Sequence, residues 1–174
     1  MTQERSTIYL AGPDVFFQDD SGEIKKQLCH DAGFTPLFPL DNEIKGADPA
    51  PDIFQANIDM IDRCHIVMAN ITPFRGPSCD LGTAFEIGYA RKAGKKVFCY
   101  SSDSRELKQR ISEDFPHFLQ DGMSIEDFGY IDNLMIGCSA PIDCIDDRDD
   151  KAALKAFQCA LERAQSEQQS EYLS

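Results

Sequence analysis

The chain has 174 residues, 42% of them hydrophobic, and a formal net charge of −13. This length and apolar content predict one domain with a complete core, spanning residues 1–174, and argue against two. Nucleic-acid binders depend on clustered Lys and Arg, so the acidic balance argues against a nucleic-acid partner and favours a small neutral or weakly charged ligand.

Short runs of β-branched, aromatic and other apolar residues predict strands at residues 7–11, 34–38, 65–71 and 95–100. The run HIVMANI at 65–71 is almost continuously hydrophobic, which is typical of a strand buried on both faces of a parallel sheet. Residues 132–137, DNLMIG, carry the last apolar core residues before a proline. By themselves these residues indicate a strand or the approach to one.

Apolar residues at intervals of three and four predict helices at residues 21–32, 52–64, 81–94 and about 149–168. Between these segments, residues 40–51 contain Gly46 and two prolines and predict a loop, and loops of this length in a compact domain are more often functional than idle. Residues 102–121 are mixed and only partly helical, and the C-terminal tail is polar.

Strands that alternate with helices of this length are typical of βαβ units. We therefore expect an α/β fold: a single doubly wound, mainly parallel sheet, flavodoxin- or Rossmann-like, with helices on both faces. Ligands of such sheets bind beyond the carboxyl ends of the strands. This rule places four segments around one cleft: the turn at 12–16, the loop around Asp41, the loop at 70–80, and the start of the helix that follows Asp80.

The segment TPFRGPSCDLGTAFEIGYARKAG, residues 72–94, carries two carboxylates suited to chemistry. Asp80 stands where a helix N-cap is expected, and Glu86 lies about one and a half turns into the helix. The residues three and four positions from Glu86 are mostly small: Gly82, Thr83, Tyr89 and Ala90. We expect an open slot around Glu86, and the helix dipole favours its ionised form. The alternative is a plain helix cap and a solvated glutamate.

Several fingerprints of cofactor and metal sites are missing from the sequence. Ala11-Gly12-Pro13 is followed by no Gly-x-x-Gly, and neither a phosphate loop nor a Gly-x-Ser-x-Gly elbow occurs. The three histidines are widely spaced and the seven cysteines form no Cys-x-x-Cys pair. We therefore expect no metal and no cofactor, and a carboxylate nucleophile under those conditions points to glycosyl transfer.

Neither a membrane span nor an export signal is apparent. No apolar run approaches the ~18 residues that cross a bilayer, and MTQERSTIYLAG has no charged leader with an apolar core. Together with the unpaired cysteines, these features predict a cytoplasmic protein without a membrane partner.

Three blocks of the sequence resemble the nucleoside 2-deoxyribosyltransferase family: IYLAGPDVF near the start, PLDN at 39–42, and ANITPFRGPSCDLGTAFEIGYARKAGKKV at 69–97. The similarity extends from residue 8 to about residue 136. The resemblance implies an enzyme that moves 2-deoxyribose between the nucleobases of deoxynucleosides. The family uses a covalent glycosyl-Glu intermediate, which implies retention at the anomeric carbon.

The resemblance also implies roles for particular residues. Glu86 corresponds to the nucleophile, Asp80 to the carboxylate that handles the proton of the base, and Tyr9 to a tyrosine that orients the nucleophile. Asn133 corresponds to a residue lent by a neighbouring subunit to hold the sugar 5′-hydroxyl, which implies a homo-oligomer, at least a dimer, with shared active sites.

Further substrate-binding candidates are Gly12, Asp14, Phe16, Asn57 and Ser78. Asn57 stands where some relatives have a second base-facing Asp, and Glu43 stands where some have a Gln. The C-terminal aromatic carboxylate of some relatives has no clear counterpart in residues 171–174.

Simpler roles stay open for several of these residues. Tyr9 and Phe16 suit the core, Asp14 suits a turn or a cap, and Arg75 suits a surface ion pair.

Two other functions remain in view. A hydrolase of the same superfamily would use the same Glu86 and pass the sugar, often as a 5′-monophosphate, to water; Ser78 and Arg75 favour it as phosphate ligands. A silent nucleotide-binding module is disfavoured because Asp80 and Glu86 are both present. The sequence leaves open the choice between purine and pyrimidine bases, and between nucleoside and 5′-monophosphate substrates.

Overall fold

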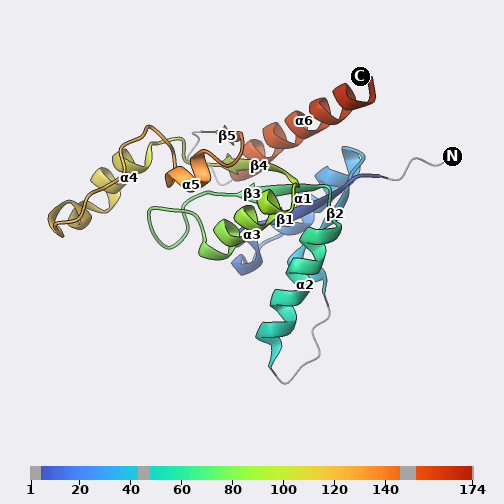
Figure 1. Ribbon diagram of the computed structural model, residues 1–174, viewed down its shortest axis with the longest axis horizontal. Helices are drawn as coiled ribbons and strands as arrows, with labels where there is room; N and C mark the ends of the chain where they lie inside the picture. Colours follow the sequence, from blue (N-terminus) through green and yellow to red (C-terminus); the bar gives the residue numbers. More distant parts are fainter. Residues whose placement is uncertain (1–4, 43–47, 146–151, 174) are drawn as a thin grey trace.

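The computed structural model describes residues 5–42, 48–145 and 152–173, with the side chains of 171–173 excepted. In these residues five parallel strands form one sheet in the order β2-β1-β3-β4-β5 (Figure 1). The strands are β1 (Thr7–Ala11), β2 (Thr35–Leu37), β3 (Ile66–Asn70), β4 (Lys96–Ser101) and β5 (Ile142–Cys144). This is the order of a flavodoxin-like sheet, so the expected doubly wound α/β fold is confirmed.

The helices between the strands make parallel pairing possible, because each chain return needs a crossover. The α-helices are α1 (Ser21–Asp31), α2 (Pro49–Arg63), α3 (Leu81–Lys92), α4 (Leu107–Asp114), α5 (Leu134–Gly137) and α6 (Ala152–Leu173). Short 3-10 helices η1 (Pro13–Phe16), η2 (Pro39–Asp41) and η3 (Pro116–Gln120) follow β1, β2 and α4.

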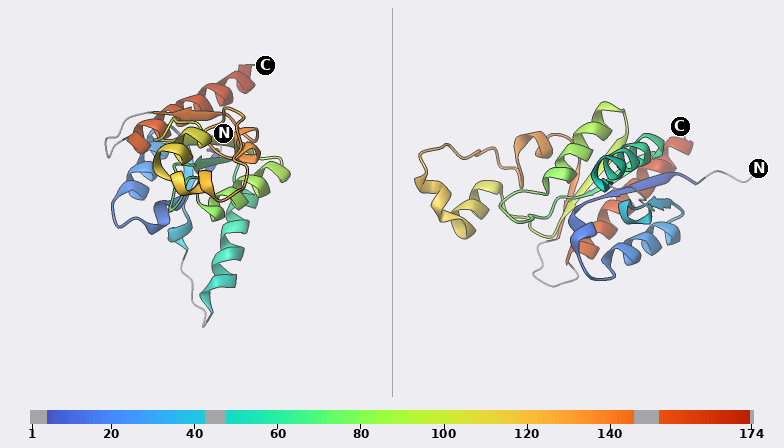
Figure 2. Two further views of the ribbon diagram at one scale, coloured as in Figure 1. Left: turned by 90° about the vertical axis from the view of Figure 1, so that its left-hand side faces the viewer. Right: turned by 90° about the horizontal axis from the view of Figure 1, so that it is seen from below.

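Two hydrophobic cores lie on opposite faces of the sheet. Alternate strand residues such as Ile8 and Met68 pack with Phe157 of α6 and Cys29 of α1. Their neighbours in sequence, Tyr9 and Val67 among them, pack with residues of α2 and α3 on the other face. Figure 2 shows the helices on both sides of the sheet. Because every second side chain serves one face, the central strands are hydrophobic at nearly every position, as the run at 65–71 predicted.

The predicted strands and helices are confirmed up to residue 101, with end shifts of one to three residues. The helix expected at 52–64 begins earlier, at Pro49, because proline is well accommodated in the first turn. Of the loop expected at 40–51, residues 43–47, which include Glu43, lie outside the described residues.

Residues 132–137 do not form a strand, although they lie on the approach to one. Their last four residues, Leu134–Gly137, form the short helix α5, because Asn133 accepts a hydrogen bond from the Met135 amide and Glu126 accepts one from the Leu134 amide. Strand β5 follows at Ile142–Cys144 and was not predicted, since it has only three residues.

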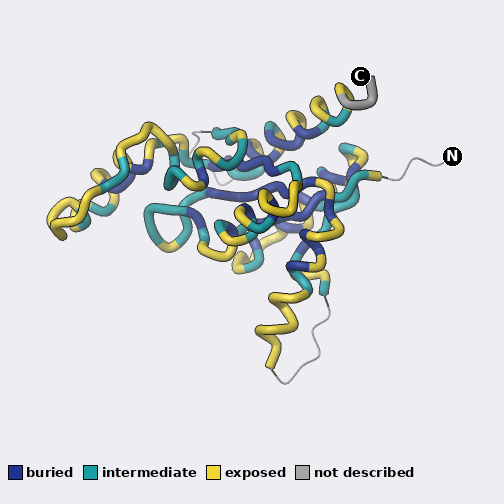
Figure 3. The backbone as a smooth tube through the Cα atoms, viewed as in Figure 1, coloured by how far each residue is buried: buried dark blue, intermediate teal, exposed yellow. Residues whose placement is uncertain are grey.

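Two parts of the molecule project from the sheet. The first turns of α2 and most of the segment from α4 to residue 130 are exposed, whereas the central strands are buried (Figure 3). None of the helices in the described part of the chain is long and apolar enough to cross a membrane.

Candidate active site

A cavity of about 400 Å³ lies beyond the carboxyl ends of β1 and β2, beside the N-terminal half of α3. The residues that line it come from four segments: Gly12, Val15, Phe16, Pro39, Leu40, Asn42, Ile53, Asn57, Asp80, Gly82, Thr83 and Glu86. Three of the segments expected around the cleft meet there: the turn at 12–16, the neighbours of Asp41, and the start of α3. Of the loop expected at 70–80 only Asp80 lines the cavity, and α2, which the topology did not place there, contributes Ile53 and Asn57.

Glu86 faces this cavity and is held from behind by Tyr9. The Tyr9 hydroxyl donates a hydrogen bond of 2.5 Å to Glu86 Oε1, and the tyrosine side chain is completely buried in β1. Burial also raises the pKa of Tyr9 far above its ordinary value, so this hydroxyl remains a donor. Glu86 is therefore not simply a solvated glutamate, and Tyr9 does more than fill the core.

Burial raises the pKa of Glu86 to about 7; the Tyr9 hydrogen bond lowers it, and the nearby charge of Asp80 raises it further. The helix dipole alone therefore predicted the wrong direction for this carboxyl, because desolvation of the buried charge outweighs it. Glu86 is largely ionised only above about pH 7.

Asp80 lies at the N-terminus of α3, as predicted. Its Oδ2 accepts hydrogen bonds from the Thr83 amide at 3.1 Å and the Thr83 hydroxyl at 3.4 Å. The carboxylate is only half-buried and lines the same cavity as Glu86. Both hydrogen bonds go to Oδ2, and no described residue donates one to Oδ1, so the second oxygen of Asp80 is available to a ligand.

Gly12 forms the floor of the cavity where β1 ends. Its φ is +155°, and a Cβ there would come within 2.7 Å of both Asn70 Cβ and Asp14 Oδ2. A larger residue would push the chain out of this position. Asp14 itself is buried, paired with the buried Lys25 and hydrogen-bonded by Asn70 at 3.2 Å, outside the cavity lining.

Asn57 and Phe16, both predicted to bind substrate, line the cavity together with Glu86. Asn57 Oδ1 is buried, and no other residue that the structure describes is hydrogen-bonded to it. Such an atom costs free energy unless a ligand or water meets it, so it marks a polar contact point in the cavity. The Phe16 ring is 55% exposed and stacks on Phe74 with centroids 5.4 Å apart, so the alternative of a core phenylalanine is wrong.

Ser78 and Asn133 lie elsewhere. They line a second, more apolar cavity of about 700 Å³ between α3 and α5. Within this chain the fold does not bring them to Glu86, and their binding roles stay predictions. Arg75, for which a surface ion pair was the simpler alternative, has its guanidinium carbon 5.0 Å from the centroid of the Phe74 ring.

The sequence interpretation missed several lining residues of the Glu86 cavity: Val15, Leu40, Ile53 and Thr83. Only Thr83 carried a signal, since it lies one turn before Glu86. Among the residues that the structure describes, no group of three or more His, Cys, Asp or Glu side chains is arranged to hold a metal ion.

Comparison with known proteins agrees with this geometry. The family model of the nucleoside 2-deoxyribosyltransferases matches residues 8–135, which include the whole cavity lining. The chain belongs to this family. A solved 2-desoxiribosyltransferase from Leishmania mexicana is 35% identical, covers 90% of this chain and 97% of its own, and superposes with a TM-score of 0.69.

Two further relatives are less similar to this chain than the Leishmania mexicana enzyme is. An uncharacterised protein of Schizosaccharomyces pombe is 31% identical over 114 residues, 60% of this chain, and the chain spans about half (54%) of that relative's length. The structure of a CMP N-glycosidase from Clostridium botulinum is 16% identical, with a TM-score of 0.50 over 88% of this chain and 98% of its own, and shares the fold.

Proposed function

We propose that this protein transfers 2-deoxyribose between nucleobases of deoxynucleosides through a covalent glycosyl-Glu86 intermediate. One observation carries the proposal: Glu86, hydrogen-bonded by a buried tyrosine, faces a cavity that also holds Asp80 and the amide oxygen of Asn57, which has no hydrogen-bond partner among the described residues. The family match and the similarity to the Leishmania mexicana enzyme support the same reaction.

The first half-reaction begins with ionised Glu86. Its carboxylate attacks the anomeric carbon from the face opposite the base, and the bond from that carbon to the base nitrogen breaks. The electron pair of that bond goes to the base, and Asp80 supplies a proton, directly or through a relay, so that the base leaves neutral. Tyr9 keeps Glu86 aligned for attack by donating to its other oxygen.

In the second half-reaction another base attacks the same carbon and displaces Glu86, while its proton passes to Asp80. Two inversions at one carbon give net retention. The cation-like transition state forms readily because a 2-deoxy sugar has no 2′-hydroxyl to withdraw electrons. The substrates are therefore deoxynucleosides and free nucleobases, in keeping with a role in nucleotide salvage.

Two residues of the cavity suit the base. Phe16 offers an exposed aromatic face at the mouth of the cavity, and Asn57 offers a buried carboxamide. Stacking accepts any base, whereas a hydrogen bond to Asn57 distinguishes base edges.

The second cavity bears on assembly. Asn133 does not line the Glu86 cavity of its own chain, and it lies beside exposed Leu81 and Met135. This placement fits a homo-oligomer in which Asn133 serves the site of a neighbouring subunit and holds the sugar 5′-hydroxyl.

Hydrolysis is the alternative outcome of the same intermediate, with water in place of the second base. The decisive experiment incubates the protein with a deoxynucleoside, with and without a second free base, and follows both nucleosides and free deoxyribose. Transfer predicts a new nucleoside of the same anomeric configuration and a deoxyribosyl adduct on the peptide that contains Glu86. Release of free sugar at the same rate with or without the acceptor base would instead assign an N-glycosidase.

A further inference from the structure

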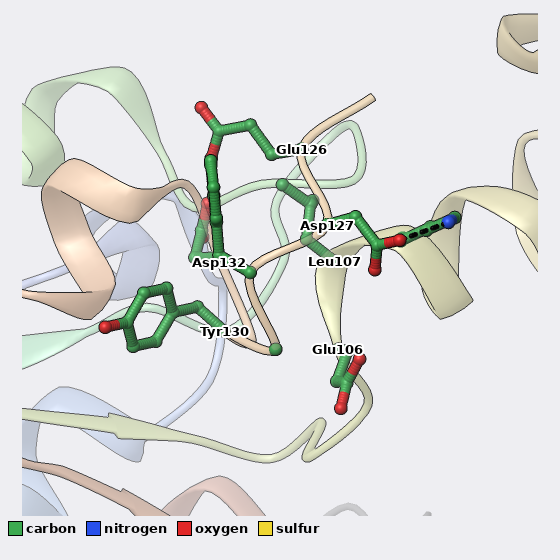
Figure 4. A pocket seen from close by; sticks show the side chains of 9 residues that line it. Glu106, Leu107, Glu126, Asp127, Tyr130 and Asp132 are labelled. Atoms are coloured by element: carbon green, nitrogen blue, oxygen red, sulfur yellow. Dashed lines mark hydrogen bonds and ion pairs between the residues drawn. The ribbon is translucent and has the colours of Figure 1, made fainter. Parts of the chain in front are cut away.

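Two buried charged residues hold the loop that leads into α3, and neither lies in the Glu86 cavity. Asp132 is 2% exposed and Arg110 is 1% exposed. Figure 4 shows Asp132 from close by, in the loop that carries Glu126 and Tyr130 past Leu107 at the start of α4. Buried charges are costly unless they are fully hydrogen-bonded, so the partners of these two residues show what they stabilise.

Asp132 binds two backbone amides, one with each oxygen. Oδ2 accepts from the Cys79 amide at 2.8 Å, and Oδ1 accepts from the Asn133 amide at 2.7 Å. Cys79 directly precedes Asp80, and Asn133 is the N-cap of α5. The Asp132 carboxylate therefore links the backbone just before Asp80, the general-acid candidate, to the backbone just before α5.

Arg110 reinforces the same connection from α4. Its Nη1 donates to the Pro77 carbonyl at 2.7 Å and to the Ile131 carbonyl at 2.9 Å, and its Nε donates to Asp103 at 3.0 Å. The loop before Asp80 is thus held at two residues by side chains far away in sequence: the Pro77 carbonyl accepts from Arg110, and the Cys79 amide donates to Asp132. Only the bond from the Phe74 amide to the Ser78 carbonyl, 3.0 Å, is seen within the described residues 73–79.

We propose that Asp132, supported by Arg110, is a positioning residue for Asp80. It fixes the Ser78–Cys79 peptide, whose N–H it binds, and through the Cys79 backbone it sets the approach of the Asp80 carboxylate to the base. This inference rests on the proposed function, because it assigns Asp132 to the proton-transfer half of that reaction. Small displacements of a catalytic group lower rates by as much as ~10²-fold. The Asp132 carboxylate can therefore have a large effect on the rate of base release without touching the substrate.

The test uses Asp132→Asn, which keeps the shape but leaves one carboxamide oxygen to accept from two amides. Base release is measured in single turnovers with two kinds of substrate. Deoxyuridine or deoxyinosine needs a proton on the departing base. The 5-nitro derivative of deoxyuridine needs none, because its base leaves as a stabilised anion. 7-Methyl-2′-deoxyguanosine needs none either, because its positively charged base leaves as a neutral molecule. The pyrimidine pair or the purine pair is used, according to which class of base the wild type accepts.

The proposal predicts that Asp132→Asn slows release of the ordinary base by about 10- to 100-fold and release of the activated base by less than about threefold. In an Asp80→Asn background the same change has no further effect, because the group it positions is already removed. The matched control is Asp143→Asn, which removes a carboxylate of β5 that binds Arg163 and leaves both rates unchanged.

Equal losses with both kinds of substrate, or additive losses in the double variant, would overturn the proposal and make Asp132 a merely structural residue. If Asp132→Asn does not fold, Arg110→Lys disturbs the Pro77 end of the same loop and is measured in the same way.

A separate measurement distinguishes this inference from the proposed function. Hydrogen–deuterium exchange of the Cys79 amide and the first turn of α3 is expected to rise in folded Asp132→Asn and not in Asp143→Asn. Unchanged exchange would overturn the inference even for an active enzyme. Lack of any base release by the wild type, with increased exchange in the variant, would overturn the proposed function and would leave Asp132 only as the residue that fixes the backbone at Cys79.

Discussion

The hydroxyl of Tyr9 and the carboxylate of Glu86 meet at 2.5 Å although 77 positions separate them in the chain. Tyr9 belongs to a central strand and Glu86 to α3, so the contact joins the sheet to the helix that packs on it. The buried tyrosine fixes Oε1 of Glu86 against the sheet. Because the carboxyl also borders the cavity, its other oxygen, Oε2, is left to a ligand.

Replacing Glu86 with Ala or Gln is expected to abolish transfer and leave the fold intact, because no other carboxylate stands behind the anomeric carbon in the proposed reaction. Rates are measured by exchange of labelled base. Glu113→Gln, an exposed change on α4, is the control and keeps wild-type activity. More than a few per cent of wild-type exchange in Glu86→Ala would show that Glu86 is not the nucleophile.

The rate of the first half-reaction is expected to fall as the pH drops through about 7, since protonated Glu86 cannot attack. Tyr9→Phe removes a hydrogen bond that lowers this pKa, so its acid limb moves to higher pH by about one unit or more and its rate falls. The pH dependence of single-turnover base release measures both effects.

The control for Tyr9→Phe is Tyr89→Phe. Tyr89 lies on the same helix as Glu86, and this change deletes an exposed hydroxyl that is hydrogen-bonded to Asp62 of α2. Its pH profile should match the wild type. A Tyr9→Phe profile that superimposes on the wild-type profile would separate Tyr9 from Glu86.

Glu86 is also expected to reduce the free energy of unfolding at neutral and alkaline pH. Its folded pKa, about 7, lies above the ordinary 4.5, so the native state binds more protons than the unfolded state between these values. Stability attributable to this group is therefore present below about pH 4.5 and lost as the pH rises to about 7.

Glu86→Gln removes that ionisation and should raise the free energy of unfolding by on the order of 1–3 kcal/mol at pH 8, with a much smaller gain at pH 5. Urea unfolding of both proteins at the two pH values measures the difference. An equal gain at both would indicate that improved packing, and not the loss of a buried charge, is responsible.

Substitutions at Asn57 are expected to change base preference more than overall chemistry. A carboxamide can accept and donate, whereas the carboxylate introduced by Asn57→Asp would only accept. We expect that variant to favour amino bases such as adenine and cytosine over oxo bases by about tenfold, and Asn57→Leu to lose discrimination between them. Competition between paired bases for one donor nucleoside measures the ratio; unchanged ratios in both variants would remove Asn57 from base recognition.

The shared-site prediction is tested by mixing subunits. Glu86→Ala and Asn133→Ala proteins are dissociated and reassembled together, so that some clefts receive an intact Glu86 from one subunit and an intact Asn133 from its neighbour. Activity above that of either parent is expected. Loss of one neutral hydrogen bond costs ~0.5–1.5 kcal/mol, so Asn133→Ala alone should lower the rate only modestly. No recovery despite confirmed mixing would assign Asn133 to its own chain or to no site.

The sequence by itself was sufficient for the first four strands of the sheet, most helices and the two carboxylates. Strand and helix periods are local properties, and the run at 65–71 or the stretch from Asp80 to Glu86 carries its pattern within a few neighbouring residues. The parallel topology then followed from the alternation of strands and helices, and it correctly gathered Gly12, Asp80 and Glu86 at one end of the sheet.

Only the tertiary structure decided the properties that depend on residues far apart in the chain. Residues 134–137 form a helix and not a strand, because Glu126 and Asn133 cap its first turn. Asp14 was drawn to the buried Lys25 and away from the cavity lining. The pKa of Glu86 was raised by burial against the helix dipole, because the cost of desolvating a charge depends on everything packed around it and not on its place in a helix.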